Sequence, residues 1–146
     1  MDIRIFKEGT ADYDRALALR DRELRQPLGL RFTTEELKKD EHDWHFGLFD
    51  GDEIAACLTL TACDGSRMKM RQVATDSAKQ GKGLGRILSH AAEKFAADKG
   101  FEVMFCNARK SAVPFYEKLG YKIVSGEFTE VGIPHYTMEK QLTHGQ

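Results

Sequence analysis

The spacing of apolar residues in the first half of the chain predicts several strands and two helices. Period-two alternation and aromatic content, bounded by turn residues, mark the strands. The predicted strands cover residues 3–6, 44–49, 53–61 and 68–75. One helix follows the first strand, with Thr10 or Asp12 placed to cap its start and with Pro27 and Gly29 placed to end it. A shorter helix is predicted over about residues 33–40.

The second half of the chain alternates between helices and strands. Apolar residues recur at the spacing of one buried helix face between residues 83 and 98, and Gly100 is placed to end that helix. A short apolar run at 101–106 predicts a buried strand parallel to the strand at 68–75, because a helix connects the two. A last helix is predicted over residues 111–119, followed by strands over 121–128 and 134–140. The whole chain therefore reads as one mixed α/β (α+β) domain.

Composition narrows the class of protein. Of 146 residues, 41% are hydrophobic and 31% are charged, which is typical of one globular domain. The 22 Lys and Arg against 23 Asp and Glu leave a net charge of −1, so no general field attracts nucleic acid or an anionic membrane. No apolar run approaches the ~18 residues of a membrane span. Three cysteines without a C-x-x-C pair, and an N-terminus without an apolar leader, lead us to expect a cytoplasmic protein.

A glycine-rich segment before the long helix is the most informative part of the sequence. It reads Gln80-Gly81-Lys82-Gly83-Leu84-Gly85-Arg86. Glycines let the backbone approach a ligand closely, and the first turn of a helix presents unpaired N–H groups with roughly half a positive charge. The segment therefore predicts a phosphate or pyrophosphate site, with Lys82 and Arg86 adding charge at its rim.

Glycine spacing separates three kinds of phosphate ligand. A Walker-type loop requires G-x-x-x-x-G-K-[ST], which no stretch of the chain matches. A dinucleotide fingerprint requires G-x-G-x-x-G and an acid at the end of the next strand, whereas the spacing here is G-x-G-x-G and that position is Asn107. The third pattern, Q-x-x-G-x-G, is met by Gln80, Gly83 and Gly85.

Together with a second segment, this loop resembles the GNAT superfamily of acetyl-CoA-dependent N-acetyltransferases. After Asn107, residues 112–121 read AVPFYEKLGY, which is similar to the second signature of that superfamily. Residues 132–135 are similar to one bacterial branch of it. The resemblance spans about residues 3–142 and is strongest from 72 to 121. It implies one GNAT-like acyltransferase domain over residues 1–146, with a mixed, mostly antiparallel, twisted sheet and helices on both faces.

The resemblance also implies acetyl-CoA as the co-substrate and assigns residues to it. The loop from Gln80 to Arg86 would hold the pyrophosphate of coenzyme A through backbone N–H groups. The backbone of Val73, Ala74 and Thr75 would pair with the pantetheine arm, and one N–H would polarise the thioester carbonyl. The Asn107 amide would bond the pantetheine or order the strands around it.

Tyr116 is the residue that the resemblance assigns as general acid. A phenol with a pKa of about 10 can protonate a CoA thiolate that leaves into a dry site. The general base is not evident. His135 is a candidate that would also contact the acceptor, because imidazole titrates near neutrality, and Glu127 and Glu23 are others. A hydrogen-bonded residue at the edge of a strand is the structural alternative for His135.

Four arginines, at positions 20, 22, 25 and 31, crowd the first helix and its exit, a region that walls the acceptor site in GNAT folds. A solvated helix face is one interpretation. The other is that Arg25 and Arg31 clamp a carboxylate or phosphate of the acceptor. No metal is expected, because His42-x-x-His45 has no Cys partner and fits a solvated loop. Cys106 is expected to be buried and inert, so no covalent enzyme intermediate is predicted.

The favoured activity is transfer of an acetyl group from acetyl-CoA to a primary amine of a small-molecule acceptor, by direct attack on the thioester. Two alternatives stay open. One is a protein or peptide N-acetyltransferase, which needs an open groove for its acceptor. The other is a non-catalytic acyl-CoA-binding module, which needs no general base. Because GNAT proteins often dimerise, a homodimer is a further expectation.

Overall fold

The computed structural model describes residues 1–142 of the chain, which form eight strands, four α-helices and five shorter helical segments. The strands are hydrogen-bonded in the order β1-β2-β3-β4-β5-β8-β6, and β7 pairs with β8. The chain divides into a first unit, residues 1–61 with 71–92, and a second unit, which takes 62–70 and continues from 93. Within residues 1–142, no helix is long and apolar enough to cross a membrane.

The first unit opens with a strand and a series of helical segments. These are β1 (Asp2–Phe6), α1 (Ala11–Arg20), η1 (Asp21–Arg25), η2 (Gln26–Leu28), α2 (Thr34–Lys38) and η3 (Lys39–His42). Thr10 caps α1 by accepting a bond from the Tyr13 N–H, and Thr33 forms a capping box with Glu36 at the start of α2. Gly29, at φ +71°, ends the first helical stretch as predicted.

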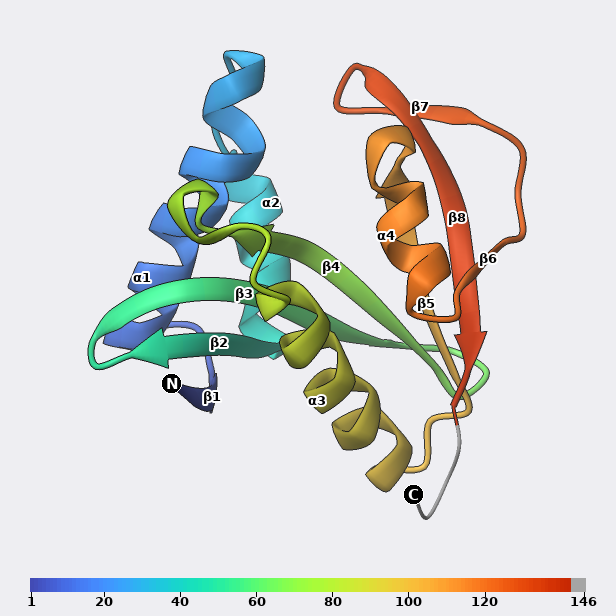
Figure 1. The fold of residues 1–146 in the computed structure, drawn as a ribbon, viewed down its shortest axis with the longest axis horizontal. Helices are drawn as coiled ribbons and strands as arrows, with labels where there is room; N and C mark the ends of the chain where they lie inside the picture. Colours follow the sequence, from blue (N-terminus) through green and yellow to red (C-terminus); the bar gives the residue numbers. More distant parts are fainter. Residues whose placement is uncertain (143–146) are drawn as a thin grey trace. The chain divides into compact units, whose positions relative to one another are not determined.

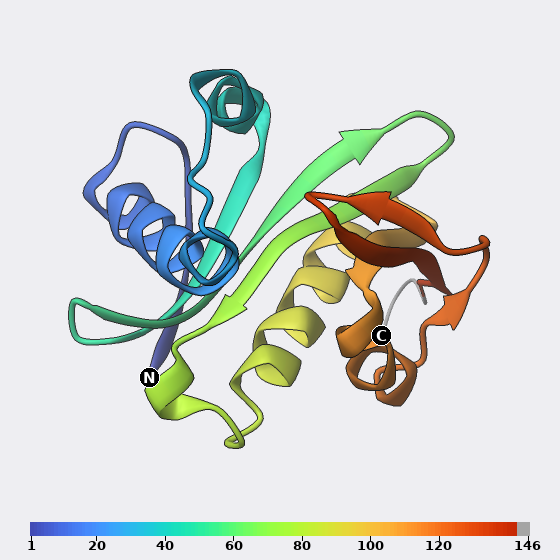
Figure 2. The ribbon, with the colours of Figure 1, turned by 90° about the horizontal axis from the view of Figure 1, so that it is seen from above.

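This unit also contains strand β2 (Trp44–Asp50), most of β3 (Glu53–Cys63), the later part of β4 (Arg67–Thr75) and the start of α3 (Leu84–Asp98). Strand β1 pairs antiparallel with β2, and β2 pairs antiparallel with β3. Figure 2 shows α1, the blue helix, beside these strands. A buried core joins the helix to them, through Phe6, Tyr13, Ala16, Leu19, Phe49, Cys57 and Ala74. Burial of each large apolar side chain of this kind stabilises the fold by about 1.5–3 kcal/mol.

A buried polar network lies beside that core. Asp40, which is 0% exposed, accepts bonds from the Tyr13 hydroxyl at 2.6 Å, from Arg20 Nη1 at 2.8 Å and from Arg71 Nη2 at 3.2 Å. Arg71 Nη2 also lies 2.6 Å from a carboxylate oxygen of Asp43. Burial alone would raise the pKa of Asp40, but the Arg20 guanidinium and the Tyr13 hydroxyl hold it below its usual value. Arg20 is 1% exposed, and its Nε and Nη2 have no hydrogen-bond partner.

The second unit is built on β5, which pairs with strands on both sides. This unit contains the start of β4 and the end of α3. Its other elements are β5 (Val103–Arg109), η5 (Lys110–Ala112), α4 (Val113–Lys118), β6 (Lys122–Ile123), β7 (Phe128–Glu130) and β8 (Ile133–Gln141). Figure 1 shows β8 beside β5, and the two pair antiparallel from Val103↔Gln141 to Arg109↔His135. On its other side, β5 pairs parallel with residues 67–69 of β4, which confirms the predicted strand–helix–strand connection.

Two predicted strands were wrong in their bounds. The strand predicted at 101–106 begins at Val103 and continues to Arg109, so Asn107 lies inside the strand rather than at its end. The strand predicted at 121–128 is divided into β6 and β7. The reason lies at Ser125, whose Oγ accepts the bond from the Thr137 N–H at 2.8 Å in place of a backbone carbonyl.

Candidate functional site

The backbone of β4 changes direction inside the strand, next to the residues expected to pair with pantetheine. Gln72 has φ +54°, the left-handed region that non-glycine residues rarely adopt. Such a residue interrupts the regular ladder, costs about 1–3 kcal/mol and is found where the surroundings impose it. Val73, Ala74 and Thr75 follow directly, and Ala74 is buried against the core of the first unit. The strained residue therefore directly precedes the segment that the resemblance assigns to the pantetheine arm and the thioester.

The turn after β4 is held by specific hydrogen bonds. The Asp76 carboxylate accepts a bond from the Ala78 N–H at 3.0 Å, which shapes the short turn η4 (Ser77–Lys79). The Ser77 N–H donates to the Glu23 carboxylate at 3.1 Å. Glu23, one of the candidate bases, is thus engaged in anchoring this turn.

The glycine loop has the backbone geometry that the sequence predicts for an anion site. Gly81 and Gly83 have φ +83° and +73°, and a Cβ at either position would meet nothing within 4 Å. Conformation rather than crowding therefore requires glycine at both positions. The Ile87 N–H donates to the Gly83 carbonyl at 3.1 Å. The N–H groups of residues 84–86 come before this donor at the start of α3, so they have no carbonyl acceptor within the helix.

Two cations flank this helix start. Lys82 and Arg86 are both exposed, and neither forms an ion pair within residues 1–142. The α3 helix is 15 residues long, so its dipole adds positive potential at the same end. Amide donors, a dipole and unpaired cations together suit a phosphate-bearing ligand.

Asn107, in the second unit, faces β8. Its Oδ1 accepts a bond at 3.0 Å from the hydroxyl of Thr137, the residue directly opposite it on β8. Its side-chain NH₂ group has no hydrogen-bond partner within the described residues. The amide is therefore oriented by one bond and keeps two donors for a ligand.

Tyr116 lies in α4 and is 6% exposed. Its ring packs edge-on against Phe115 and Tyr121, with centroids 5.1 and 5.7 Å away. Within residues 1–142 its hydroxyl makes no hydrogen bond. Burial raises its pKa, with the Cys106 thiol as a smaller cause. Tyr121 differs, because its hydroxyl donates to the Glu93 carboxylate at 2.8 Å.

His135 is buried in β8 and oriented on both sides. Its Nδ1 lies 2.9 Å from the Ile133 carbonyl, which makes Nδ1 the protonated nitrogen, and the ring stacks on Phe128. Its Nε2 lies 3.6 Å from a carboxylate oxygen of Glu130. A neutral His135 therefore keeps the Nε2 lone pair as a proton acceptor.

The remaining base candidate is less suited to that role. The Glu127 carboxylate accepts bonds from Lys110 at 3.0 Å and from the Tyr136 hydroxyl at 3.2 Å. The Lys110 hydrogen bond and charge lower the pKa of Glu127, which weakens it as a base. His135 is thus the better oriented of the candidates.

The arginines near α1 divide into paired and unpaired ones. Arg25, expected to clamp the acceptor, is buried and lies 2.9 Å from the Glu36 carboxylate, with its guanidinium 4.2 Å from the Phe32 ring centroid. Arg20 is held by Asp40. Arg31 is exposed, lines a pocket and forms no ion pair within residues 1–142. Of the two residues of the predicted clamp, only Arg31 keeps its guanidinium free of a carboxylate.

His45, Cys57 and Cys106 have structural roles. His45 is buried, with Nδ1 3.0 Å from the Thr59 hydroxyl and Nε2 3.0 Å from the Asp40 carbonyl, so neither nitrogen is available to a metal. Burial is the main cause that lowers its pKa. The thiols of Cys57 and Cys106 are buried, which raises the pKa of each to about 12.

Comparison with known proteins adds an independent finding. A sequence model of the acetyltransferase (GNAT) domain matches residues 24–142. The Bacillus subtilis protein named uncharacterized N-acetyltransferase YjcF is 35% identical over 107 residues, which are 73% of this chain and 74% of the relative.

Solved structures agree in fold. One from Lactobacillus plantarum, assigned as an N-acetyltransferase, has a TM-score of 0.86 and 28% identity, and the match covers 98% of this chain and 100% of the other. An aminoglycoside 6'-N-acetyltransferase solved with coenzyme A has a TM-score of 0.79 and 19% identity over 97% of both chains. The second likeness concerns the fold alone.

Proposed function

The chain belongs to the GNAT acetyltransferase family, and from this premise we propose that it transfers an acetyl group from acetyl-CoA to the primary amine of a small-molecule acceptor. The observation that carries the proposal is the open start of α3, where Gly81 and Gly83 adopt positive φ and two unpaired cations stand close in sequence. This arrangement supports binding of the coenzyme A pyrophosphate by backbone N–H groups.

The proposed chemistry begins with direct attack of the acceptor nitrogen on the thioester carbonyl. The new C–N bond forms as the C–S bond breaks, and the sulfur leaves as a thiolate. Backbone N–H groups after Gln72 would stabilise the oxygen that gains charge in this step. The buried thiol of Cys106, whose pKa is raised to about 12, supports transfer without a covalent enzyme intermediate.

Tyr116 then donates its proton to the thiolate, and the second proton that the acceptor nitrogen loses as the amide forms restores the phenol. Burial raises the pKa of this phenol, which on its own weakens it as an acid. The same dry surroundings raise the pKa of a thiol, as Cys106 in this unit illustrates. Because burial raises both values, the tyrosine is not disfavoured as an acid for a thiolate that leaves into the same surroundings.

His135 is the base that we propose for the ammonium proton of the acceptor. Its Nδ1–H is held by the Ile133 carbonyl, which leaves Nε2 to accept the proton. In His135→Gln, kcat should fall at least roughly tenfold while acetyl-CoA affinity stays within twofold, because the Gln side chain cannot accept the proton. An unchanged kcat in that variant would remove His135 from the mechanism.

The test of the proposal starts with calorimetric titration of the protein with acetyl-CoA, NADH and ATP, one at a time. We expect saturable binding of acetyl-CoA and none of NADH. Thiol release is then followed over a panel of small amines, for the wild type and Tyr116→Phe. The variant should lose about 10²-fold or more in kcat while its acetyl-CoA affinity stays within twofold. Tyr136→Phe, whose hydroxyl bonds Glu127, is the matched control and should keep kcat.

Two results would contradict this reading. Failure of the folded protein to bind acetyl-CoA would end the assignment of the glycine loop. Binding without thiol release to any amine would instead identify an acyl-CoA-binding module.

A further inference from the structure

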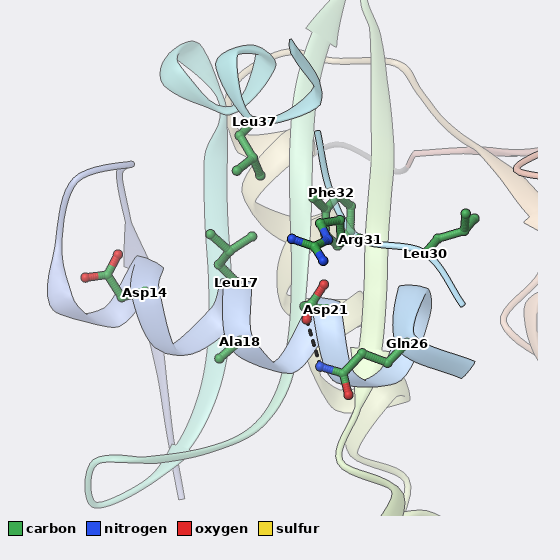
Figure 3. A pocket seen from close by; sticks show the side chains of 9 residues that line it. All are labelled: Asp14, Leu17, Ala18, Asp21, Gln26, Leu30, Arg31, Phe32 and Leu37. Carbon is green, nitrogen blue, oxygen red and sulfur yellow. Dashed lines mark hydrogen bonds between the residues drawn. The ribbon is translucent and has the colours of Figure 1, made fainter. Parts of the chain in front are cut away.

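A pocket of about 630 Å³ opens on the first unit between α1 and the segment that leads into α2. Figure 3 shows its lining side chains, among which Arg31 is the one that the sequence assigned to a possible acceptor clamp. Leu17, Leu30, Phe32 and Leu37 supply apolar surface. The volume is within the range of small-molecule sites, which is about 300–1,000 Å³.

One wall of the pocket is held in place from behind. The guanidinium carbons of Arg20 and Arg25 lie 4.7 and 4.2 Å from the centroid of the Phe32 ring. Both arginines are buried and fixed by carboxylates, Arg20 by Asp40 and Arg25 by Glu36. Stacking on two anchored cations orients the ring, so this apolar wall is formed before any ligand arrives.

The pocket also presents charges of both signs that have no ionic partner. Asp14 and Asp21 are seven residues apart, which places them on one face of the helical stretch about 10 Å apart, with Leu17 between them. Asp21 accepts one bond, from the neutral Gln26 amide at 2.8 Å. Neither carboxylate nor Arg31 forms an ion pair within the described part of the chain. Figure 3 shows Arg31 and Asp21 pointing into the same part of the pocket.

This combination selects among ligand charges. A simple anion attracted by Arg31 would face two carboxylates, and a simple cation attracted by them would face Arg31. A ligand that carries a positive and a negative group attached to one carbon can pair with the carboxylate and with Arg31 at the same time. The apolar wall then requires a hydrocarbon group attached to the same centre.

We propose that this pocket binds a free α-amino acid with an apolar side chain. Asp21 holds the ammonium group, Arg31 holds the carboxylate, and Leu17 and Phe32 contact the side chain. Asp14 adds negative potential on the ammonium side. The inference concerns binding and does not depend on acetyl transfer.

The test uses the full chain without acetyl-CoA, titrated with L-leucine at neutral pH by calorimetry or by changes in amide NMR signals. We expect saturable binding of L-leucine. N-acetyl-L-leucine lacks the ammonium charge, L-leucine methyl ester lacks the carboxylate, and glycine lacks the side chain. Each of these three should bind at least roughly tenfold more weakly, the factor that a loss of about 1.4 kcal/mol produces.

Variants separate the two charges. Asp21→Asn keeps an oxygen that can accept the Gln26 bond, yet it should weaken L-leucine at least roughly tenfold and leave N-acetyl-L-leucine unchanged. Arg31→Gln should weaken L-leucine and leave the methyl ester unchanged. Glu35→Gln and Lys38→Gln are matched controls, because both side chains are exposed and neither lines the pocket.

Three outcomes would overturn the proposal. These are the absence of saturable L-leucine binding by folded protein, equal binding of L-leucine and its two charge-deficient analogues, and equal losses in the pocket and control variants. Each is measured without coenzyme A, so none bears on the proposed acetyl transfer.

Discussion

Asp40→Asn is the substitution whose effect the structure defines most sharply. Asp40 is fully buried, and within residues 1–142 its carboxylate is the one group that forms an ion pair with Arg20. Asn matches the aspartate in size and keeps one acceptor oxygen, so the substitution removes charge without opening a cavity. Arg71 would still have Asp43 at 2.6 Å. The substitution therefore removes stabilising charge mainly from Arg20, whose Nε and Nη2 already lack hydrogen-bond partners.

The expected loss in the free energy of unfolding follows from the unpaired charge on Arg20. Removing one member of a buried ion pair leaves the other charge uncompensated, at about 3–5 kcal/mol. Folded domains of this kind are stable by about 5–15 kcal/mol in all, so the variant should lose a large fraction of its free energy of unfolding. The stacking of Arg20 on Phe32 stays in place and does not offset the lost charge.

Urea unfolding followed by the fluorescence of Trp44, the one tryptophan of the chain, measures this loss. Glu41→Gln is the control, because that side chain is exposed and should change the free energy of unfolding by less than about 0.5 kcal/mol. A loss in Asp40→Asn no larger than in the control would refute the reasoning that the charge stabilises Arg20.

The same variant gives a signature against pH. The pKa of Asp40 is lowered in the folded state, so its stabilisation is present above the unfolded pKa of about 3.9 and is lost as the pH falls through the folded pKa. Wild type and Asp40→Asn should therefore differ most near pH 7 and converge below about pH 3.9. A difference that stays constant into acid would point to packing rather than charge.

Two further predictions concern the glycine loop and the thiols. Gly83→Ala places a side chain at positive φ, at a cost of about 1–2 kcal/mol, and should weaken acetyl-CoA binding at least roughly tenfold when measured by calorimetry. The control Gly126→Ala lies at an open site without positive φ and should not weaken binding. Equal affinities of the two variants would place the anion elsewhere. With a thiol reagent at pH 8, native protein should label at Cys63 alone and urea-unfolded protein at all three cysteines, because burial raises the pKa of Cys57 and Cys106 to about 12; rapid labelling of two thiols in the native state would contradict this.

Local signals in the sequence were sufficient for much of the fold. Thr10 and Thr33 cap helices through bonds to backbone groups within three residues, and Gly29 ends a helical stretch by its own conformation. Such features depend on neighbours in sequence, which a single chain displays. The positive φ of Gly81 and Gly83 is a local feature of the same kind, whereas the pyrophosphate site at this loop stays a prediction.

Features that depend on distant neighbours were not predictable. Ser125 divides a predicted strand because its hydroxyl meets Thr137 on another strand. Gln72 has no local feature that announces a positive φ, since Gln is not a residue type that favours it. Asp40 and Arg71 are 31 residues apart, and nothing in their spacing indicates that they share a buried network.

The division of the chain has a consequence for synthesis on the ribosome. The boundaries between the units fall inside regular elements, after Thr61 in β3, after residue 70 in β4 and after residue 92 in α3. Residues 62–70 therefore emerge before the rest of the second unit. At about 5–20 residues per second, the 50 residues from 93 to 142 need roughly 3–10 s. For that interval Met68, which is buried in the native fold and pairs with Met104 of β5, is without that partner.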